Sequence, residues 1–141
     1  AFGRGETIMV HGHPLELVLV KNPSGFRLGL TSFTTRGYAT MIAINDNYAD
    51  GRDMSWLWDV SFESLRGSGV SHVSGSRAYD MGLRLAYDEV TYCNINTNLD
   101  VSLSDFITTH PDTPKRIYCT YTAMLTLRRS LKKIANVTEV A

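Results

Sequence analysis

The sequence predicts an α/β fold, and three observations support this. Short β-rich runs alternate with amphipathic helical stretches along the chain, a pattern that favours βαβ units. The length of 141 residues suits one domain with a core of its own. The content of 43% apolar and 20% charged residues is typical of a globular protein. We therefore expect one Rossmann-like domain, with a mostly parallel sheet covered by helices on both faces.

The N-terminal part of the chain is predicted to form a hairpin. Apolar runs at 7–10 and 15–20 flank a turn-like tetrapeptide at 11–14, His-Gly-His-Pro. The first run is the expected antiparallel edge strand. His11 and His13 lie two residues apart, as metal ligands can, but no third ligand is close in sequence. A solvated turn is therefore favoured over a metal site.

The first helix is expected to begin at Asn22 and Pro23, because Asn is a good N-cap and Pro suits the first helical position. Apolar residues recur at helical spacing as far as Phe33, and Gly37 is the expected end of the helix. Residues 38–44 are then predicted to form the next strand.

A polar loop follows, and then a short helix at 62–66, a strand at 70–73 and a tight turn at 74–76. The turn leads into a helix with three apolar side chains on one face, Tyr79, Leu83 and Tyr87.

The last third of the chain repeats this alternation. It is predicted to contain a strand at 90–95, a helix at 102–109 that ends before Pro111, and a strand at 116–120. Thr122 is expected to cap the final helix. Asp105 is interpreted as an acidic residue in the first turn of its helix.

Charge and composition exclude some classes of function. Fourteen basic and fourteen acidic residues balance, which argues against a nucleic-acid-binding protein. No apolar run approaches the ~20 residues that span a bilayer. We expect a cytoplasmic protein in which Cys93 and Cys119 are reduced and buried; a disulfide or a nucleophilic pair is the less favoured alternative. The chain does not begin with Met, so we expect a fragment of a longer protein.

The most informative stretch is 45–53, Asn-Asp-Asn-Tyr-Ala-Asp-Gly-Arg-Asp, which follows the predicted strand at 38–44 directly. So many charged and amide groups cannot form a core, because burying unpaired charge costs too much free energy. The segment that follows contains Trp56 and Trp58, which are expected to pin the loop to the domain. We therefore predict a functional loop.

Ligands of open parallel sheets bind beyond the carboxyl ends of the strands. Polar or glycine-containing turns are expected at that edge at 21–25, 45–53, 74–77 and 121–122. None of the four histidines falls in these turns, so the edge has carboxylates without a nucleophile and base of its own. A positioned Asp can, however, orient a histidine that another protein supplies.

These segments together resemble the C-terminal domain of MurT, the Mur-ligase-like subunit of bacterial lipid II isoglutaminyl synthase. Residues 45–56 carry most of the match, and 21–25, 74–78 and 121–125 support it in the expected order. Residues 2–6, Phe-Gly-Arg-Gly-Glu, resemble the joint between the central ATPase domain and the C-terminal domain of Mur ligases.

The resemblance implies a division into residues 1–6, the end of an interdomain linker, and residues 7–141, a Mur ligase C-terminal domain of the MurT type. The central ATPase domain is expected to be absent from this chain. That domain would contain the phosphate-binding loop and the Mg²⁺ ligands, so no metal site is expected here.

The implied activity is that of an ATP-dependent carbon–nitrogen ligase of peptidoglycan synthesis. The α-carboxylate of D-glutamate in lipid II is activated with ATP and Mg²⁺ as an acyl phosphate. A partner glutaminase, GatD, releases ammonia from glutamine and so allows D-isoglutamine to form. The reaction is expected on lipid II at the cytoplasmic face of the membrane, and the isolated domain is expected to be inactive.

The resemblance also implies roles for individual residues. Asp53 would complete the Cys–His–Asp triad of GatD, whereas Asp50 is expected to shape the turn. Arg4, Lys21 and Asn22 are expected on the nucleotide side of the cleft. The residues expected to line the substrate side are Asn45, Asp46 and Asn47.

Simpler readings of single residues and two other readings of the whole chain remain. Asn22 is at least as well explained as a simple helix cap, and residues 74–76 as an ordinary tight turn. The whole chain could also be a non-catalytic interaction module that docks through the loop Asn45–Trp58, or a nucleotide-binding enzyme that acts alone.

Overall fold

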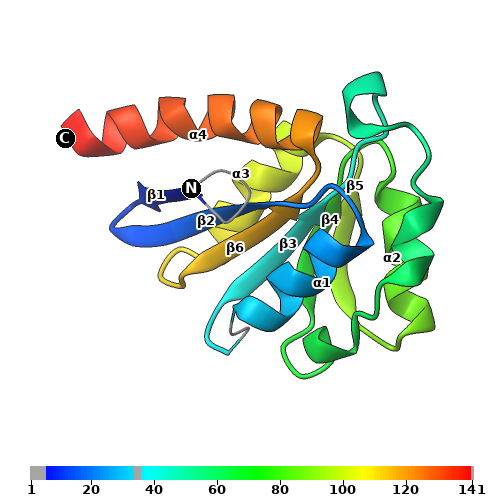
Figure 1. Ribbon diagram of the computed structural model, residues 1–141. Helices are drawn as coiled ribbons and strands as arrows, with labels where there is room; N and C mark the ends of the chain where they lie inside the picture. The colour runs from blue at the N-terminus through cyan, green and yellow to red at the C-terminus, as the bar shows by residue number, and fades with distance from the viewer. Residues whose placement is uncertain (1–5, 34–35, 141) are drawn as a thin grey trace.

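Six strands form one sheet in the computed structural model, which describes residues 6–33 and 36–140, with 135–140 described by their backbone alone. The strand order is β1-β2-β6-β3-β4-β5 (Figure 1). The strands are β1 (Glu6–Val10), β2 (His13–Leu19), β3 (Ala39–Ala43), β4 (Val70–Ser74), β5 (Tyr92–Asn96) and β6 (Lys115–Cys119). β1 is antiparallel to β2, and every other neighbouring pair is parallel. The mostly parallel sheet with an antiparallel N-terminal edge is thus confirmed.

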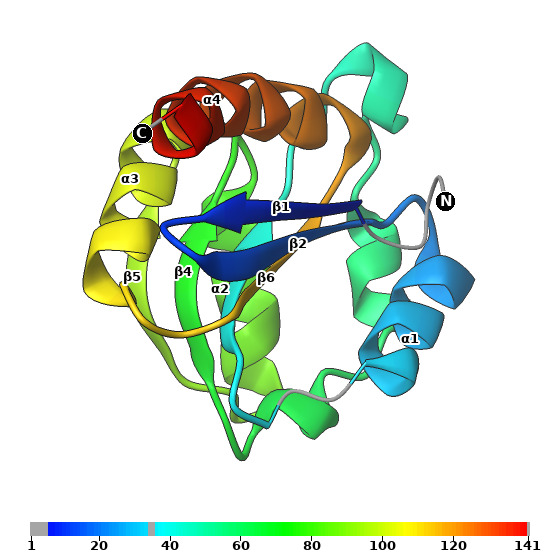
Figure 2. The same ribbon diagram turned by 90° about the vertical axis from the view of Figure 1, so that its left-hand side faces the viewer.

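Helices cover both faces of this sheet. The α-helices of the described residues are α1 (Pro23–Ser32), α2 (Ala78–Tyr87), α3 (Leu99–Thr109) and α4 (Tyr121–Val140). Figures 1 and 2 show α1 and α2 on one face and α3 and α4 on the other. Three 3₁₀ turns join β3 to β4: η1 (Tyr48–Asp50), η2 (Ser55–Asp59) and η3 (Glu63–Leu65). No helix of the described residues is both long enough and apolar enough to cross a membrane.

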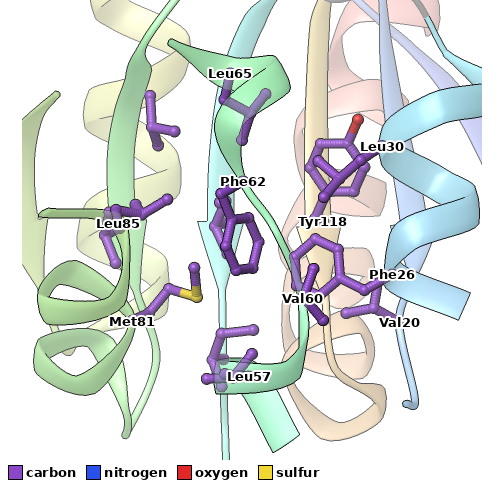
Figure 3. Close-up of a cluster of buried hydrophobic side chains, with 14 of the residues drawn as sticks. Val20, Phe26, Leu30, Leu57, Val60, Phe62, Leu65, Met81, Leu85 and Tyr118 are labelled. Atoms are coloured by element: carbon purple, nitrogen blue, oxygen red, sulfur yellow. The ribbon is translucent and has the colours of Figure 1, made fainter. Parts of the chain in front are cut away.

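Each face of the sheet has its own apolar core. Phe26 packs on two other aromatic rings in the first core, with its ring 5.0 Å from that of Phe62 and 5.6 Å from that of Tyr118 (Figure 3). The second core lies under α3 and α4, where Phe106 and Leu127 are fully buried. Burying a side chain of this size contributes about 1.5–3 kcal/mol. The loop after β3 supplies Leu57 to the first core, so the core holds part of that loop in place.

The parallel strands end level with one another. Cys119 of β6 is paired with Leu19 on one side and with Ala43 on the other, and Ala43 is paired with Ser74. The segments that follow β2, β3, β4 and β6 therefore emerge side by side at the carboxyl edge of the sheet. This is the edge where sequence reasoning placed the functional loop.

Two element boundaries differ from the prediction. The hairpin turn consists of His11 and Gly12 alone, with φ of 53° and 82°, because two residues with positive φ match the twist of the flanking strands. His13 already belongs to β2. Helix α1 begins at the predicted cap but ends at Ser32 rather than at Gly37. Phe33 leaves the helix with an extended backbone, and its ring lies 4.8 Å from the Arg116 guanidinium.

The α2 and α3 predictions also needed correction. The three apolar side chains of α2 share one face, but that face points to solvent; Met81 and Leu85 lie on the buried face. Helix α3 begins at Leu99, because the Asn98 side chain caps it by accepting a hydrogen bond from the Val101 N–H at 3.0 Å. Asp105 therefore lies in the middle of α3 and not in its first turn.

The two cysteines lie in different environments. Cys119 is buried, and burial raises the pKa of its thiol to about 12. Cys93 is exposed, contrary to expectation, because β5 is the edge strand of the sheet. The first three residues of β5, Tyr92, Cys93 and Asn94, are all exposed.

Candidate functional site

Asn45 joins three strand ends at the carboxyl edge. Its backbone N–H donates to the Thr120 hydroxyl at 2.9 Å and its side-chain amide donates to the Thr122 hydroxyl at 3.0 Å. Its side-chain oxygen accepts the Ser76 N–H at 2.9 Å. Only 7% of Asn45 is exposed. A buried amide with this set of partners fixes the start of the loop relative to β4 and β6.

The turn after β4 packs directly against the end of β3. Gly75 has a φ of 98°, and a Cβ at this position would lie 2.2 Å from the Ile44 carbonyl oxygen. Only glycine fits this conformation and this approach. The Arg77 N–H also donates to the Ile44 carbonyl at 2.9 Å. The Ser74-Gly75-Ser76 turn is therefore a structural requirement for the start of the loop.

Asp50 is occupied by bonds within the domain. Its carboxylate accepts the Thr122 N–H at 2.8 Å, the Thr122 hydroxyl at 2.5 Å and the Asn47 N–H at 3.0 Å. Helix α4 begins at Tyr121, so Thr122 lies in its first turn, and its side chain binds Asp50 instead of capping the helix. This result confirms Asp50 as the residue that shapes the turn, because a carboxylate with three donors has little capacity left for a ligand.

The backbone next turns sharply and presents Asp53. Gly51 and Arg52 have φ of 95° and 59°, and the Asp53 N–H donates to the Gly51 carbonyl at 2.6 Å. The Asp53 carboxylate accepts the Ser55 N–H at 3.0 Å. Hydrogen bonds from the backbone and side chain of Ser55 hold the pKa of Asp53 below its usual value. Within the described residues only Ser55 binds this carboxylate, which is otherwise exposed.

Asp53 lies on a hollow of about 330 Å³ that Asp46, Arg77 and Asp80 also line. Arg77 pairs with Asp80 at 2.7 Å and lies 3.7 Å from Asp46. The guanidinium thus offsets the two carboxylates next to it, and within the described residues Asp53 forms no ion pair with it. None of the described residues that line the hollow is a histidine, cysteine or lysine.

Trp56 and Trp58 differ in how they pack on the domain. Trp56 is half-buried, and its ring lies edge-on to Phe26 at 6.3 Å, so it anchors the loop as predicted. Trp58 remains 44% exposed and packs on Tyr87 at 5.1 Å. Beneath it, the buried Arg84 side chain donates to the carbonyls of Leu57 and Val60. Hydrogen bonds from the buried Arg84 guanidinium to the backbone therefore hold this part of the loop, in place of the second tryptophan anchor that was predicted.

A second hollow, of about 410 Å³, lies at the same edge and is lined by Lys21, Asp50 and Thr120 among others. Lys21 places a cation there. Asn22 caps α1, as its side-chain oxygen accepts the Gly25 N–H at 2.8 Å. The capping role of Asn22 is confirmed. Arg4 falls outside the described residues.

The structure brings Asn45, Asp46, Asn47 and Asp53 into one continuous loop. Asp46 accepts the Ser76 hydroxyl at 3.0 Å, and the Asn47 amide donates to the Thr122 hydroxyl at 3.1 Å. Asn45 and Asn47 thus meet on the same threonine hydroxyl. In the described ranges, 6–33 and 36–140, no group of three or more metal-ligating side chains is positioned to hold a metal ion.

Sequence reasoning missed a second cluster at the opposite edge of the sheet. Ser71, His72, Asp105 and His110 are joined there by hydrogen bonds. Their separation in sequence hid the cluster, because only the packing of α3 against β4 brings them together. The one available sequence signal for this cluster was the polar pair Ser71-His72 between the valines of the β4 strand.

The chain is similar to known proteins in this region and beyond it. The family model described as MurT ligase C-terminal matches residues 19–124. The lipid II isoglutaminyl synthase (glutamine-hydrolyzing) subunit MurT of Streptococcus pneumoniae (strain ATCC BAA-255 / R6) is 32% identical over 136 residues, which are 92% of this chain and 30% of that protein.

The proteins of the same name from Staphylococcus aureus strains COL and N315 are each 41% identical over 76 residues, covering 51% of this chain and 17% of the relative. The chain thus spans less than a third of the length of the curated relatives it matches. The family model covers both the functional loop and the strand ends around it. On this evidence the chain belongs to the MurT ligase C-terminal family.

Proposed function

We propose that this chain is the C-terminal domain of the glutamate-amidating subunit of a lipid II isoglutaminyl synthase. In that role it acts with a central ATPase domain and a GatD-type glutaminase on lipid II, at the cytoplasmic face of the membrane. The names of the relatives and the family match support this proposal. The amide that forms on the D-glutamate α-carboxylate takes its nitrogen from glutamine.

Asp53 is the residue through which we propose that the domain takes part in catalysis. The observation that carries this proposal is an exposed carboxylate, oriented by Ser55, on a hollow whose described lining contains no histidine. Such a group can accept the N–H of a histidine from the partner and fix its tautomer and orientation. The other ring nitrogen then takes the proton of the partner's cysteine thiol, which attacks the glutamine amide.

Electrostatics favour this role for Asp53. The hydrogen bonds from Ser55 hold the pKa of Asp53 below 3.8, so the group is a carboxylate at every pH where a histidine is titrated. An ionised carboxylate stabilises the imidazolium that forms when the histidine takes the thiol proton. Asp50 lacks this capacity, because donors within the domain already occupy its oxygens.

The nucleotide side of the cleft is proposed at the second hollow of the carboxyl edge. Lys21 fits a polyphosphate by its charge, and Arg4 of the linker is proposed to join it. ATP supplies the activating phosphoryl group of the ligase reaction. Mg²⁺ is proposed to bind in the central ATPase domain.

The direct test is Asp53→Asn in the full ligase subunit bound to its glutaminase. Asparagine cannot accept the histidine N–H as a carboxylate does, so glutamine hydrolysis should fall by about 10⁴-fold. The matched control is Asp80→Asn, because Asp80 lines the same hollow but pairs with Arg77. That variant should retain hydrolysis, and both variants should still bind the partner in titration calorimetry.

The rival proposal is a non-catalytic module that docks through the loop Asn45–Trp58. The exposed pair of Trp58 and Tyr87 beside the loop favours it. Under that proposal Asp53→Asn leaves glutamine hydrolysis unchanged in a complex that still assembles. That outcome would exclude the triad role and leave docking as the function of the loop.

A further inference from the structure

A third cavity lies at the amino edge of the sheet, on the far side from Asp53. It measures about 550 Å³ and opens between the first residues of β3, β4 and β5 and the end of α3. Ligand cavities in proteins commonly have volumes of about 300–1,000 Å³. The proposed ligase function uses the carboxyl edge only and leaves this cavity without a role.

Four polar side chains on its wall form one hydrogen-bonded chain. His72 Nε2 lies 2.6 Å from Asp105 Oδ2, and His72 Nδ1 lies 2.7 Å from the Ser71 hydroxyl. The same hydroxyl lies 2.8 Å from His110 Nε2. His72 is only 2% exposed, and its ring is held edge-on against Phe106 at 5.4 Å.

The chemistry of these groups allows one arrangement of protons when Asp105 is ionised and both histidines are neutral. A carboxylate only accepts, so His72 Nε2 carries the proton that Asp105 receives. His72 Nδ1 is then an acceptor, and the Ser71 hydroxyl must donate to it. The Ser71 oxygen in turn accepts the N–H of His110. Burial lowers the pKa of His110, with the nearby Lys115 as a smaller cause, and favours its neutral form.

We propose that Ser71 is an activated nucleophile that attacks small neutral carboxylic esters bound in this cavity. His72 is the general base, and Asp105 is a positioning residue that acts through His72. The three groups have the roles of a Ser–His–Asp triad. In the serine proteases the histidine Nε2 faces the serine and Nδ1 the aspartate, whereas here Nδ1 faces Ser71 and Nε2 faces Asp105. Ser–His–Asp triads occur on several unrelated folds, so a triad is recognised by the geometry and the chemical roles of its residues and not by the fold that holds it.

Cleavage of the ester by Ser71 changes no oxidation state, so it requires no oxidant or reductant. The Ser71 oxygen forms a bond to the ester carbonyl carbon, and its proton passes to His72 Nδ1. The bond from that carbon to the alkoxy oxygen then breaks, and the leaving alkoxide takes the proton from His72 to give an alcohol. Water hydrolyses the acyl-serine by the same route and regenerates the Ser71 hydroxyl.

A separate observation points to a ligand. Thr40 lines the same cavity, is 2% exposed, and has a hydroxyl with no hydrogen-bond partner among the described residues. A buried hydroxyl without a hydrogen-bond partner destabilises the fold. A carbonyl oxygen bound in the cavity would accept from Thr40 and remove that cost. The same hydroxyl can then stabilise the oxyanion of the tetrahedral intermediate.

The cavity also limits the charge of its substrate. Asp105 leaves 55% of its side chain exposed at the wall, so it repels a ligand with a carboxylate or phosphate. Threonines and Asn94 supply polar contacts around it. A small uncharged ester fits these features better than an acidic one.

The test is covalent labelling of the full chain with a fluorophosphonate, followed by peptide mapping in a mass spectrometer. Ser71 should form the adduct, and turnover of p-nitrophenyl acetate should accompany it. Asp105→Asn should slow labelling by about 100-fold, because the histidine loses its orienting partner. The Ser68→Ala variant is the matched control, since Ser68 is exposed on the same cavity but lies outside the chain of hydrogen bonds.

Three results would overturn the proposal. One is the absence of an adduct on Ser71 in the folded wild-type chain. The second is an adduct whose rate is the same in Asp105→Asn, with circular dichroism confirming that the variant is folded. The third is equal labelling of Ser68 and Ser71. None of these results bears on the glutaminase assay of Asp53→Asn, so the two proposals fail separately.

Discussion

Asp50 and Asp53 lie three residues apart and have opposite environments. Asp50 accepts hydrogen bonds from Thr122 and Asn47, whereas Asp53 accepts hydrogen bonds from Ser55 alone among the described residues. The backbone between them turns at two residues of positive φ. A carboxylate that is satisfied within the domain stabilises the fold, and one that is left open can act on a partner.

This difference predicts distinct effects for the two asparagine variants. Asp50→Asn replaces an acceptor with a donor that faces the Thr122 hydroxyl and the Asn47 N–H, so the free energy of unfolding should fall by about 2 kcal/mol. Urea unfolding of the chain measures this loss. Asp53→Asn should lower the free energy of unfolding by less than Asp50→Asn, because Asp53 is exposed and Ser55 is its one partner among the described residues. If Asp50→Asn abolishes glutamine hydrolysis as fully as Asp53→Asn while the fold stays intact, the catalytic carboxylate has been misassigned.

At the scale of elements, Arg84 of α2 holds η2 in place. Its guanidinium donates to two η2-region carbonyls and pairs with Asp88 at 3.0 Å. Asp88 also accepts the Phe62 N–H at 2.8 Å. The 3₁₀ turns after the functional loop therefore depend on one ion pair at the end of α2. Short turns of this kind have little stability of their own.

The ion pair predicts a pH-dependent stability. Burial raises the pKa of Asp88, but Arg84 and the Phe62 N–H outweigh it and hold the pKa below 3.8. A lowered pKa contributes stability that is complete above pH 3.8 and is lost as the pH falls through the folded value. Asp88→Asn should therefore cost about 2 kcal/mol near neutral pH and progressively less below pH 3.8.

Denaturant unfolding at several pH values measures this difference. The matched control is Glu89→Gln, because Glu89 is exposed and lies 3.7 Å from Arg66. That variant should behave like the wild type at every pH. A constant difference between the wild type and Asp88→Asn down to pH 2 would contradict the ion-pair assignment.

The sequence predicted an element correctly where residues close to it in the chain determine its structure. The cap at Asn22 has its chemical cause in the nearby Gly25 N–H, and a glycine between two serines marks the turn at 74–76, so sequence was enough to find both. The close approach of Gly75 to Ile44 of the neighbouring strand end could not be predicted, because it depends on the pairing of β3 with β4. The outward face of α2 was not predictable, because Arg84 takes an interior position that periodicity assigns to an apolar residue. The start of α3 was missed because Asn98 lies in a polar stretch that resembles a loop.

At the scale of the molecule, the parallel sheet separates two sites. The strands of the sheet run from the Ser71 cavity at the amino edge to the Asp53 loop at the carboxyl edge. The carboxyl edge was predictable, because the ends of parallel strands must meet. The cluster at the amino edge was not, because His72 and Asp105 are 33 residues apart in sequence. Only the strand order and the packing of α3 bring them together.

This separation predicts that the two sites act independently. Asp53 and Asp105 share no hydrogen-bond partner in the described part of the chain, and substitutions at distant sites without shared partners have additive effects. Asp53→Asn should leave fluorophosphonate labelling of Ser71 unchanged, and Asp105→Asn should leave glutamine hydrolysis in the complex unchanged. In the double variant, the change in unfolding free energy should equal the sum of the single changes to within about 0.5 kcal/mol. A double-mutant cycle in the full complex measures all three quantities. Coupling beyond that limit, or loss of labelling in Asp53→Asn, would show that the sheet transmits a change between its edges.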